Sequence, residues 1–175
     1  IGKSGVSAVN IDATGGYGKT AWAGGLLGYG EDTSIGSSDV NILSNGFANS
    51  SITVAGAATV FTGGIAGEVI NTKEQSYIMN SAVSVTMKLP NSGKITAGGL
   101  YGKVNWALIG ASYARDYLIA RAPADTAQLT PGGNDRIAGV VGELRGSELI
   151  AVYGVGKSGA VVTTYPGMYH TGGNN

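Results

Sequence analysis

Cysteine is absent from this chain of 175 residues, which excludes disulfide bonds, thiolate metal sites and a cysteine nucleophile. Histidine occurs once, as His170, and one imidazole cannot form a multi-histidine zinc site. Only 13% of residues are charged, and eleven basic residues balance eleven acidic ones, which argues against nucleic acid or an anionic membrane as the main partner. No run of about 18 apolar residues occurs, so we expect no membrane insertion. The lack of thiols suits an exported protein.

Glycine, in contrast, accounts for 31 of the 175 residues. Thr, Ser, Asn and Val are frequent, whereas Glu and Lys are scarce. This composition favours tight turns and short strands over helices. We therefore expect an all-β fold.

A six-residue motif, x-[Gly/Ala]-Gly-apolar-x-Gly, occurs four times at intervals of 39, 35 and 40 residues. Its copies are 23–28, 62–67, 97–102 and 137–142. The repeat glycines are Gly25, Gly28, Gly64, Gly67, Gly99, Gly102, Gly139 and Gly142. A regular period in this range predicts stacked units, each burying its apolar face against its neighbours. The glycines would permit corners with positive φ or let one backbone approach the next, while the apolar residue before the last two positions would point inward.

The repeats lie near 21–60, 61–95, 96–136 and 137–170, with a partial repeat at 1–20, in a single domain. Each motif is followed by an isoleucine (Ile35, Ile78, Ile109, Ile150) and then by a β-rich segment. We expect two or three short strands per repeat, arranged as a β-solenoid or β-helix. A β-sandwich or an open barrel with similar glycine-rich hairpins is the alternative.

Two copies match a known signature closely: residues 25–28 read Gly-Leu-Leu-Gly and residues 99–102 read Gly-Leu-Tyr-Gly. The sequence thus resembles the GLUG repeat, in which a segment like Ile-x-x-Ser-Tyr-Ala follows the glycines; residues 109–114 match that second half. The copy at 64–67 departs most, because it has no Ser-Tyr pair after it. The resemblance implies an extracellular β-solenoid segment of a bacterial surface protein or adhesin, and it implies no peptidase activity.

Residues 2–9 resemble 156–162, so the chain begins with the tail half of a repeat. An unfinished end must be capped or paired with another chain, and a head-to-tail contact that does not close would give a filament. The alternative is that the chain is a piece of a longer protein.

The segment 121–136 contains two prolines and a Gly-Gly turn, and we expect it to be an exposed loop that meets a partner. Exposed aromatic rings could also stack on a glycan or on a neighbouring subunit. The residues predicted to interact are Trp22, Trp106, Arg121, Asp125, Asp135 and Arg136.

Catalytic and cofactor motifs are weak. Residues 18–20 and 156–158 imitate a phosphate loop but lack its first glycine. Carboxylates such as Glu143 show no spacing that places a pair across a cleft. Glu31-Asp32 with Asp39, and Asn134-Asp135, offer oxygen ligands for a structural calcium ion but match no known loop. We therefore expect a non-enzymatic extracellular structural or adhesion module without a cofactor, which binds a protein partner or its own copies; a carbohydrate-binding or carbohydrate-cleaving β-helix is the alternative.

Overall fold

The computed structural model describes residues 4–7, 10–16, 18–35, 45–72, 76–79, 81–90, 93–121 and 135–156. These residues form strands and turns, with no helix among them. The strands are β1 (Ser4–Ser7), β2 (Asn10–Thr14), β3 (Thr20–Gly24), β4 (Leu27–Glu31), β5 (Asn45–Ala55), β6 (Thr59–Gly63), β7 (Ala66–Ile70), β8 (Ser76–Met79), β9 (Ser81–Leu89), β10 (Lys94–Gly98), β11 (Tyr101–Asn105), β12 (Ala107–Gly110), β13 (Tyr113–Arg121), β14 (Arg136–Ala138), β15 (Val141–Arg145), β16 (Glu148–Ile150) and β17 (Tyr153–Gly156).

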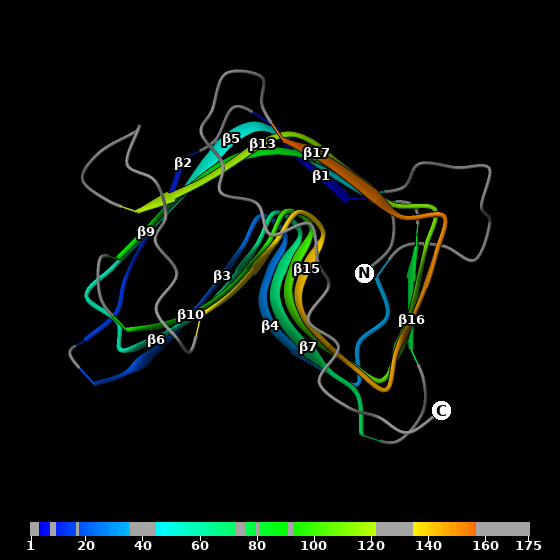
Figure 1. Ribbon diagram of the computed structural model, residues 1–175, viewed down its shortest axis with the longest axis horizontal. Coiled ribbons are helices and arrows are strands. Elements are labelled where there is room, and N and C mark those ends of the chain that lie inside the picture. Colours follow the sequence, from blue (N-terminus) through cyan, green and yellow to red (C-terminus); the bar gives the residue numbers. More distant parts are fainter. Residues whose placement is uncertain are drawn as a thin grey trace.

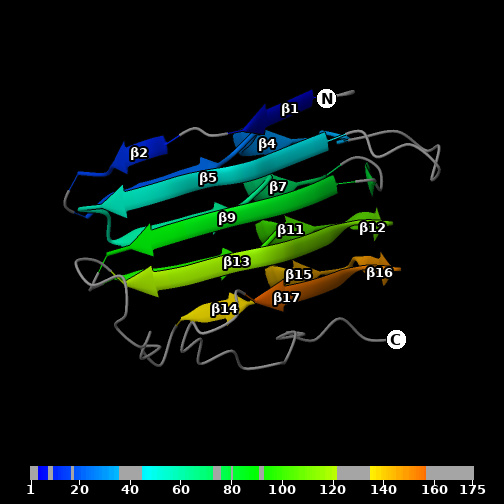
Figure 2. The same ribbon diagram turned by 90° about the horizontal axis from the view of Figure 1, so that it is seen from above.

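The strands form four parallel sheets, and the chain visits the sheets in turn (Figures 1 and 2). Sheet A contains β1 and β2 beside β5, then β9, β13 and β17; sheet B runs β3-β6-β10-β14. Sheet C runs β4-β7-β11-β15, and sheet D runs β8-β12-β16. From β6 onward each coil has four strands, more than the two or three expected. The all-β prediction is confirmed, and the described sheets form no closed barrel.

The strand register reproduces the spacing of the glycine motif. Gly24 pairs with Gly63, Gly63 with Gly98, and Gly98 with Ala138. The motif forms the bend between sheets B and C, and the ladder continues through it: the amides of Leu26, Ile65 and Leu100 each donate to the next coil. Ile65 and Leu100 are fully buried, so the predicted inward stack is present.

Of the two roles proposed for the repeat glycines, close backbone approach is the one that the structure supports. None of the described repeat glycines has a positive φ, which occurs instead at Gly18, Gly56, Gly93 and Gly146. A Cβ on Gly102 would lie 2.3 Å from the carbonyl oxygen of Gly67 and 2.7 Å from the amide nitrogen of Thr62. A Cβ on Gly99 would lie 2.8 Å from the Cβ of Ala114 in sheet A. The bend therefore packs main chain against main chain.

The alignment of the fourth repeat needs a correction by one residue. Ile109 pairs with Ile78 on one side and with Leu149 on the other, whereas Ile150 pairs with Gly110. Leu149 packs against the core and Ile150 is 55% exposed. Two adjacent apolar residues fitted the same place in the sequence, and only the pleat of the strand decides which one faces inward.

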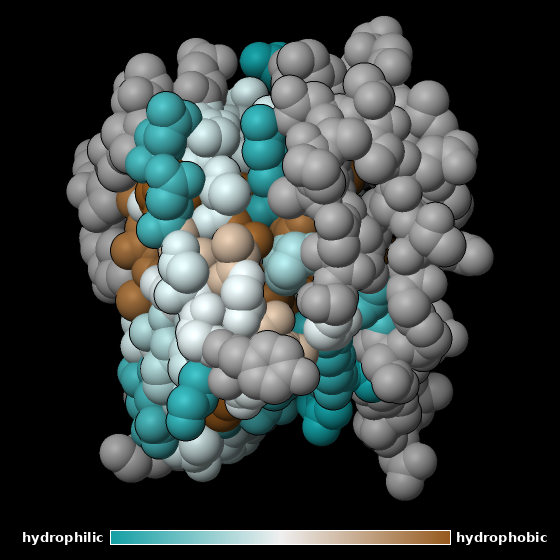
Figure 3. All heavy atoms as spheres, turned by 90° about the vertical axis from the view of Figure 1, so that its left-hand side faces the viewer, coloured by the Kyte–Doolittle hydropathy of each residue, from teal (hydrophilic) through white to brown (hydrophobic). Residues whose placement is uncertain are grey.

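The core lies inside the coils and is built mainly from Val, Ile, Leu and Ala, with Tyr101 the largest fully buried side chain. On the face where sheets A and B meet, pale residues of intermediate hydropathy cover much of the described surface, between separate hydrophilic side chains (Figure 3). In the described part of the chain, no helix has the length and apolar character needed to cross a membrane.

Candidate functional site: the seam between sheets B and C

The residues that flank each glycine motif gather on the outer side of the bend. The residue before the motif is Trp22, Phe61, Thr96 or Arg136, and these four are paired rung by rung along sheet B. The residue after the motif is Tyr29, Glu68, Lys103 or Glu143, and these four are paired along sheet C. We call these two rows of four residues the seam.

The seam faces away from the core because of strand alternation. In β3, Ala21 and Ala23 are buried in the core on either side of the exposed Trp22. In β6, Val60 and Thr62 are buried on either side of Phe61, which is half-buried. Successive side chains of a strand point to opposite faces, so the row of Trp22 points outward. Because the chain bends at the motif, the outward rows of sheets B and C meet side chain to side chain.

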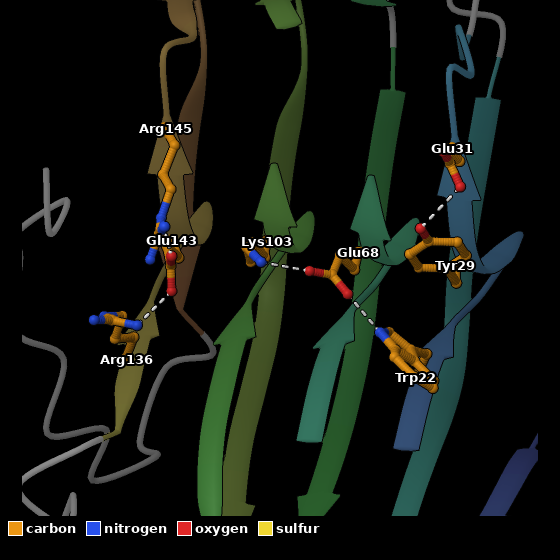
Figure 4. A network of polar contacts seen from close by, with 8 residues as sticks. All are labelled: Trp22, Tyr29, Glu31, Glu68, Lys103, Arg136, Glu143 and Arg145. Carbon is orange, nitrogen blue, oxygen red and sulfur yellow. Dashed lines mark hydrogen bonds and ion pairs between the residues drawn. The ribbon is translucent and has the colours of Figure 1, made fainter. Parts of the chain in front are cut away.

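Glu68 lies at the centre of the first contact network (Figure 4). Its Oε2 accepts a hydrogen bond of 2.5 Å from the indole Nε1 of Trp22, and its Oε1 accepts one of 2.6 Å from Nζ of Lys103. The Glu68 side chain is only 5% exposed, so its charge depends on these partners. One partner comes from sheet B and the other from sheet C.

Aromatic rings surround this carboxylate. Trp22 stacks on Phe61 with centroids 6.3 Å apart and meets Tyr29 edge-on at 5.7 Å. Nζ of Lys103 lies 5.3 Å from the centroid of Phe61, within the range of a cation–π contact. Partial desolvation and the negative charge of Glu31 raise the pKa of Tyr29, whose hydroxyl donates to Glu31. The hydroxyl is therefore a neutral donor at physiological pH.

Glu143 forms a second network of the same kind two strands further on (Figure 4). Its Oε2 accepts from Arg136 and its Oε1 from Arg145, each at 2.5 Å. The carboxylate is 2% exposed, Arg136 is 24% exposed and Arg145 is 52% exposed. Again one donor belongs to sheet B and the other to sheet C, so each buried carboxylate ties the two sheets together.

The separation of the two carboxylates bears on catalysis. Glu68 and Glu143 are two strands apart, roughly 10 Å, which approaches the spacing of an inverting glycosidase pair. However, Lys103 occupies the rung between them, and each carboxylate has both oxygens engaged by donors. This geometry suits a cross-sheet lock better than proton transfer to a substrate.

Thr96 is the one seam residue with an unmet hydrogen bond. Its side chain is fully buried, and its Oγ1 has no hydrogen-bond partner in the described structure. It lies between Phe61 and Arg136 in the sheet B row. A buried unpaired hydroxyl costs stability, so this rung is the weak point of the seam.

The structure brings two of the six predicted interaction residues, Trp22 and Arg136, into the seam. Trp106 lies elsewhere, at the turn from sheet C to sheet D. Asp135 accepts a hydrogen bond from the amide of Ile95 through its Oδ1, which makes it a structural contact rather than a free loop residue. Arg121 ends β13, while Asp125 and the rest of 122–134 lie outside the described residues.

The predicted calcium ligands do not converge. Asp32 accepts bonds from the amide and the hydroxyl of Thr72, and Asp39 and Asn134 lie outside the described residues. Where the chain is described, no three acidic, histidine or cysteine side chains are grouped as a metal site would require.

Comparison with known proteins gave no match. No protein-family model, no curated protein and no solved structure is similar to this chain by these comparisons. The interpretation of the seam therefore depends on its own contacts.

Sequence reasoning did not find the seam as a set. It named Trp22, Arg136 and Glu143 for separate reasons and passed over Phe61 and Glu68. The signal was present in the residue that follows the last glycine of each motif, which reads Tyr, Glu, Lys and Glu in order. Alternating charges at one repeat position predict a ladder of ion pairs once the repeats are stacked.

Proposed function

We propose that this chain is a β-solenoid module of an extracellular surface protein, with a structural or adhesive role and no catalytic one. The observation that carries the proposal is the register: the same motif position pairs with itself from coil to coil, at the bend and on both sides of it. Stacked coils whose seam charges are spent on each other make a stiff scaffold. The resemblance to GLUG repeats of bacterial surface proteins supports the extracellular location.

Labelling of intact cells that make the protein tests this location. An antibody against the chain should label unpermeabilised cells, and mild protease treatment of those cells should remove the label. Labelling that appears only after the cells are permeabilised would contradict the proposal. An antibody against a cytoplasmic protein serves as the control for cell integrity.

End-to-end assembly is a further part of this proposal, and the register sets a condition on it. β1 and β2 lie beside β5, in a layer one coil before β3. If β3 of an incoming copy paired with β14, its β1 would fall where β17 already lies beside β13. Assembly through continuous sheets therefore requires β1 to be displaced.

Sedimentation velocity of two chains tests this condition. The full chain should remain a monomer, whereas a chain that lacks residues 1–9 should form oligomers, because sheets B and C are then free to continue into the next copy. Circular dichroism checks that the shortened chain is folded. A folded, monomeric shortened chain would refute end-to-end assembly, and filaments of the full chain would refute the displacement of β1.

Carbohydrate binding is the second candidate function. Trp22 is 43% exposed, Tyr29 is 42% exposed and Trp106 is 39% exposed, which is unusual for rings of this size. Such rings serve as stacking surfaces for the apolar faces of sugars. A glycan-array signal that is lost when Trp22 or Trp106 is replaced would favour this function over a purely structural one.

A further inference from the structure

Trp106 has a backbone conformation that its residue type rarely adopts. It lies between β11 and β12 with φ of 57°, in the left-handed region. The corresponding positions of the first and fourth coils are Asp32, with φ of 48°, and Gly146, with φ of 52°. Aspartate and glycine tolerate this region, whereas a bulky side chain there is strained. Tryptophan is therefore the exceptional residue at this turn.

The fold uses the main chain of Trp106 but not its ring. Its amide donates to the carbonyl oxygen of Arg145 at 2.8 Å, and its carbonyl oxygen accepts from Nδ2 of Asn71 at 3.2 Å. Any residue could supply these two groups, and glycine would do so without strain. Among the described residues, nothing forms a hydrogen bond or a ring contact with the indole, which is 39% exposed overall as a residue.

This combination differs sharply from Trp22. The Trp22 ring stacks on Phe61, and its Nε1 donates to Glu68, so its place in the structure is accounted for by packing. Trp106 costs strain and gives no such contact in return. A strained residue that persists without a packing reason points to a function for its side chain.

The surroundings of Trp106 indicate the class of ligand. On the next rung Gly146 has no side chain, so that side of the indole is not covered by a neighbour from the same row. The exposed surface nearby carries Arg145 and Ser147, and the turn of the first coil carries Asp32 bonded to Thr72. An apolar ring among guanidinium, hydroxyl and carboxylate groups matches a sugar ring, which has one apolar face and a rim of hydroxyls.

We propose that Trp106 is the stacking anchor of a carbohydrate-binding site at the corner between sheets C and D. The proposal deepens the carbohydrate candidate and rests on it, but it is independent of the cell-surface and assembly proposals. The indole would stack on one sugar ring, and the polar groups of the corner would bond to its hydroxyls. The site requires no metal and no change of conformation.

The test is calorimetric titration of the full chain with four neutral oligosaccharides: cellohexaose, xylohexaose, maltohexaose and chitohexaose. We expect at least one to bind with a dissociation constant below about 5 mM. Trp106→Gly should weaken that binding at least about tenfold and raise Tm by about 2–4 °C, because strain is relieved. Trp106→Tyr should keep most of the binding.

Ala111→Gly is the matched control. Ala111 also lies at a turn with positive φ, of 46°, so glycine should relieve strain there while the binding stays unchanged. The inference is overturned if no oligosaccharide binds the original chain, if Trp106→Gly binds as well as the original chain, or if Trp106→Gly lowers Tm, which would make the ring a structural group. None of these outcomes bears on surface labelling of intact cells.

Discussion

Trp22 and Glu68 belong to different sheets and different coils, and the indole of one donates to the carboxylate of the other at 2.5 Å. The contact crosses the bend of the glycine motif, so it holds sheet B against sheet C from outside the core. Glu68 is nearly inaccessible to water, and Lys103 is its other described partner. The pairing of a buried charge with one neutral and one charged donor makes the Trp22 contact measurable.

Trp22→Phe should destabilise the chain by about 1–2 kcal/mol, because it keeps an aromatic ring but leaves Oε2 of the buried Glu68 without its donor. Urea denaturation followed by circular dichroism measures the change. Tyr29→Phe is the control: its hydroxyl donates at 3.4 Å to the exposed Glu31, so it should cost less than about 0.5 kcal/mol. Equal effects of the two variants would show that the indole bond carries no stability.

The seam also shows what could be predicted from the sequence. The glycine spacing gave the coil register correctly at Gly24, Gly63 and Gly98, because close packing of main chains accepts only the smallest residues there. The positions next to the motif are occupied by different residues in every coil, from Trp22 to Arg136. No repeated residue marks them, and their contacts become visible only once the strands are stacked.

The choice between Leu149 and Ile150 failed for a different reason. Both are apolar and adjacent, so periodicity alone could not decide which one follows Ile109 in the core. The strained turn at Trp106 could not be predicted either, because tryptophan is the residue that turn chemistry would least suggest at a positive φ. Such exceptions are where function is expected to override local preference.

Removal of the second carboxylate should have a larger effect than removal of its exposed partner. Glu143→Ala leaves Arg136 partly buried without its anion and should cost about 2–3 kcal/mol. Arg145→Gln should cost less than about 1 kcal/mol, because Arg145 is 52% exposed and water replaces its contact. Denaturant titration of both variants in low and high salt measures this. A larger loss for Arg145→Gln would refute the assignment of Arg136 as the principal partner.

Gly102→Ala should strain the bend directly. The added methyl would lie 2.3 Å from the carbonyl oxygen of Gly67 and 2.7 Å from the amide nitrogen of Thr62, and neither main-chain atom can move without breaking the ladder. We expect a loss of about 3 kcal/mol, read as a fall in Tm. At the exposed Gly16 an alanine would meet only the flexible side chain of Lys19, at 3.4 Å, and should change stability by less than about 0.5 kcal/mol. An unaltered Tm for Gly102→Ala would contradict the close packing of sheets B and C.

The inward stack of the motif makes the strongest prediction about the fold. Leu100 is fully buried, and its main chain is bonded to the coils on both sides through Ile65 and Val140. Leu100→Ala should cost about 2–5 kcal/mol through the cavity that it leaves. Leu100→Asp should unfold the chain, because an unpaired charge in this position has no water and no cation within the stack. Ile150→Asp is the matched control, since Ile150 is 55% exposed, and it should leave the fold intact. Circular dichroism and the dispersion of amide signals in NMR spectra separate these outcomes: a folded Leu100→Asp chain, or an unfolded Ile150→Asp chain, would place the wrong residues in the core and refute the coil register.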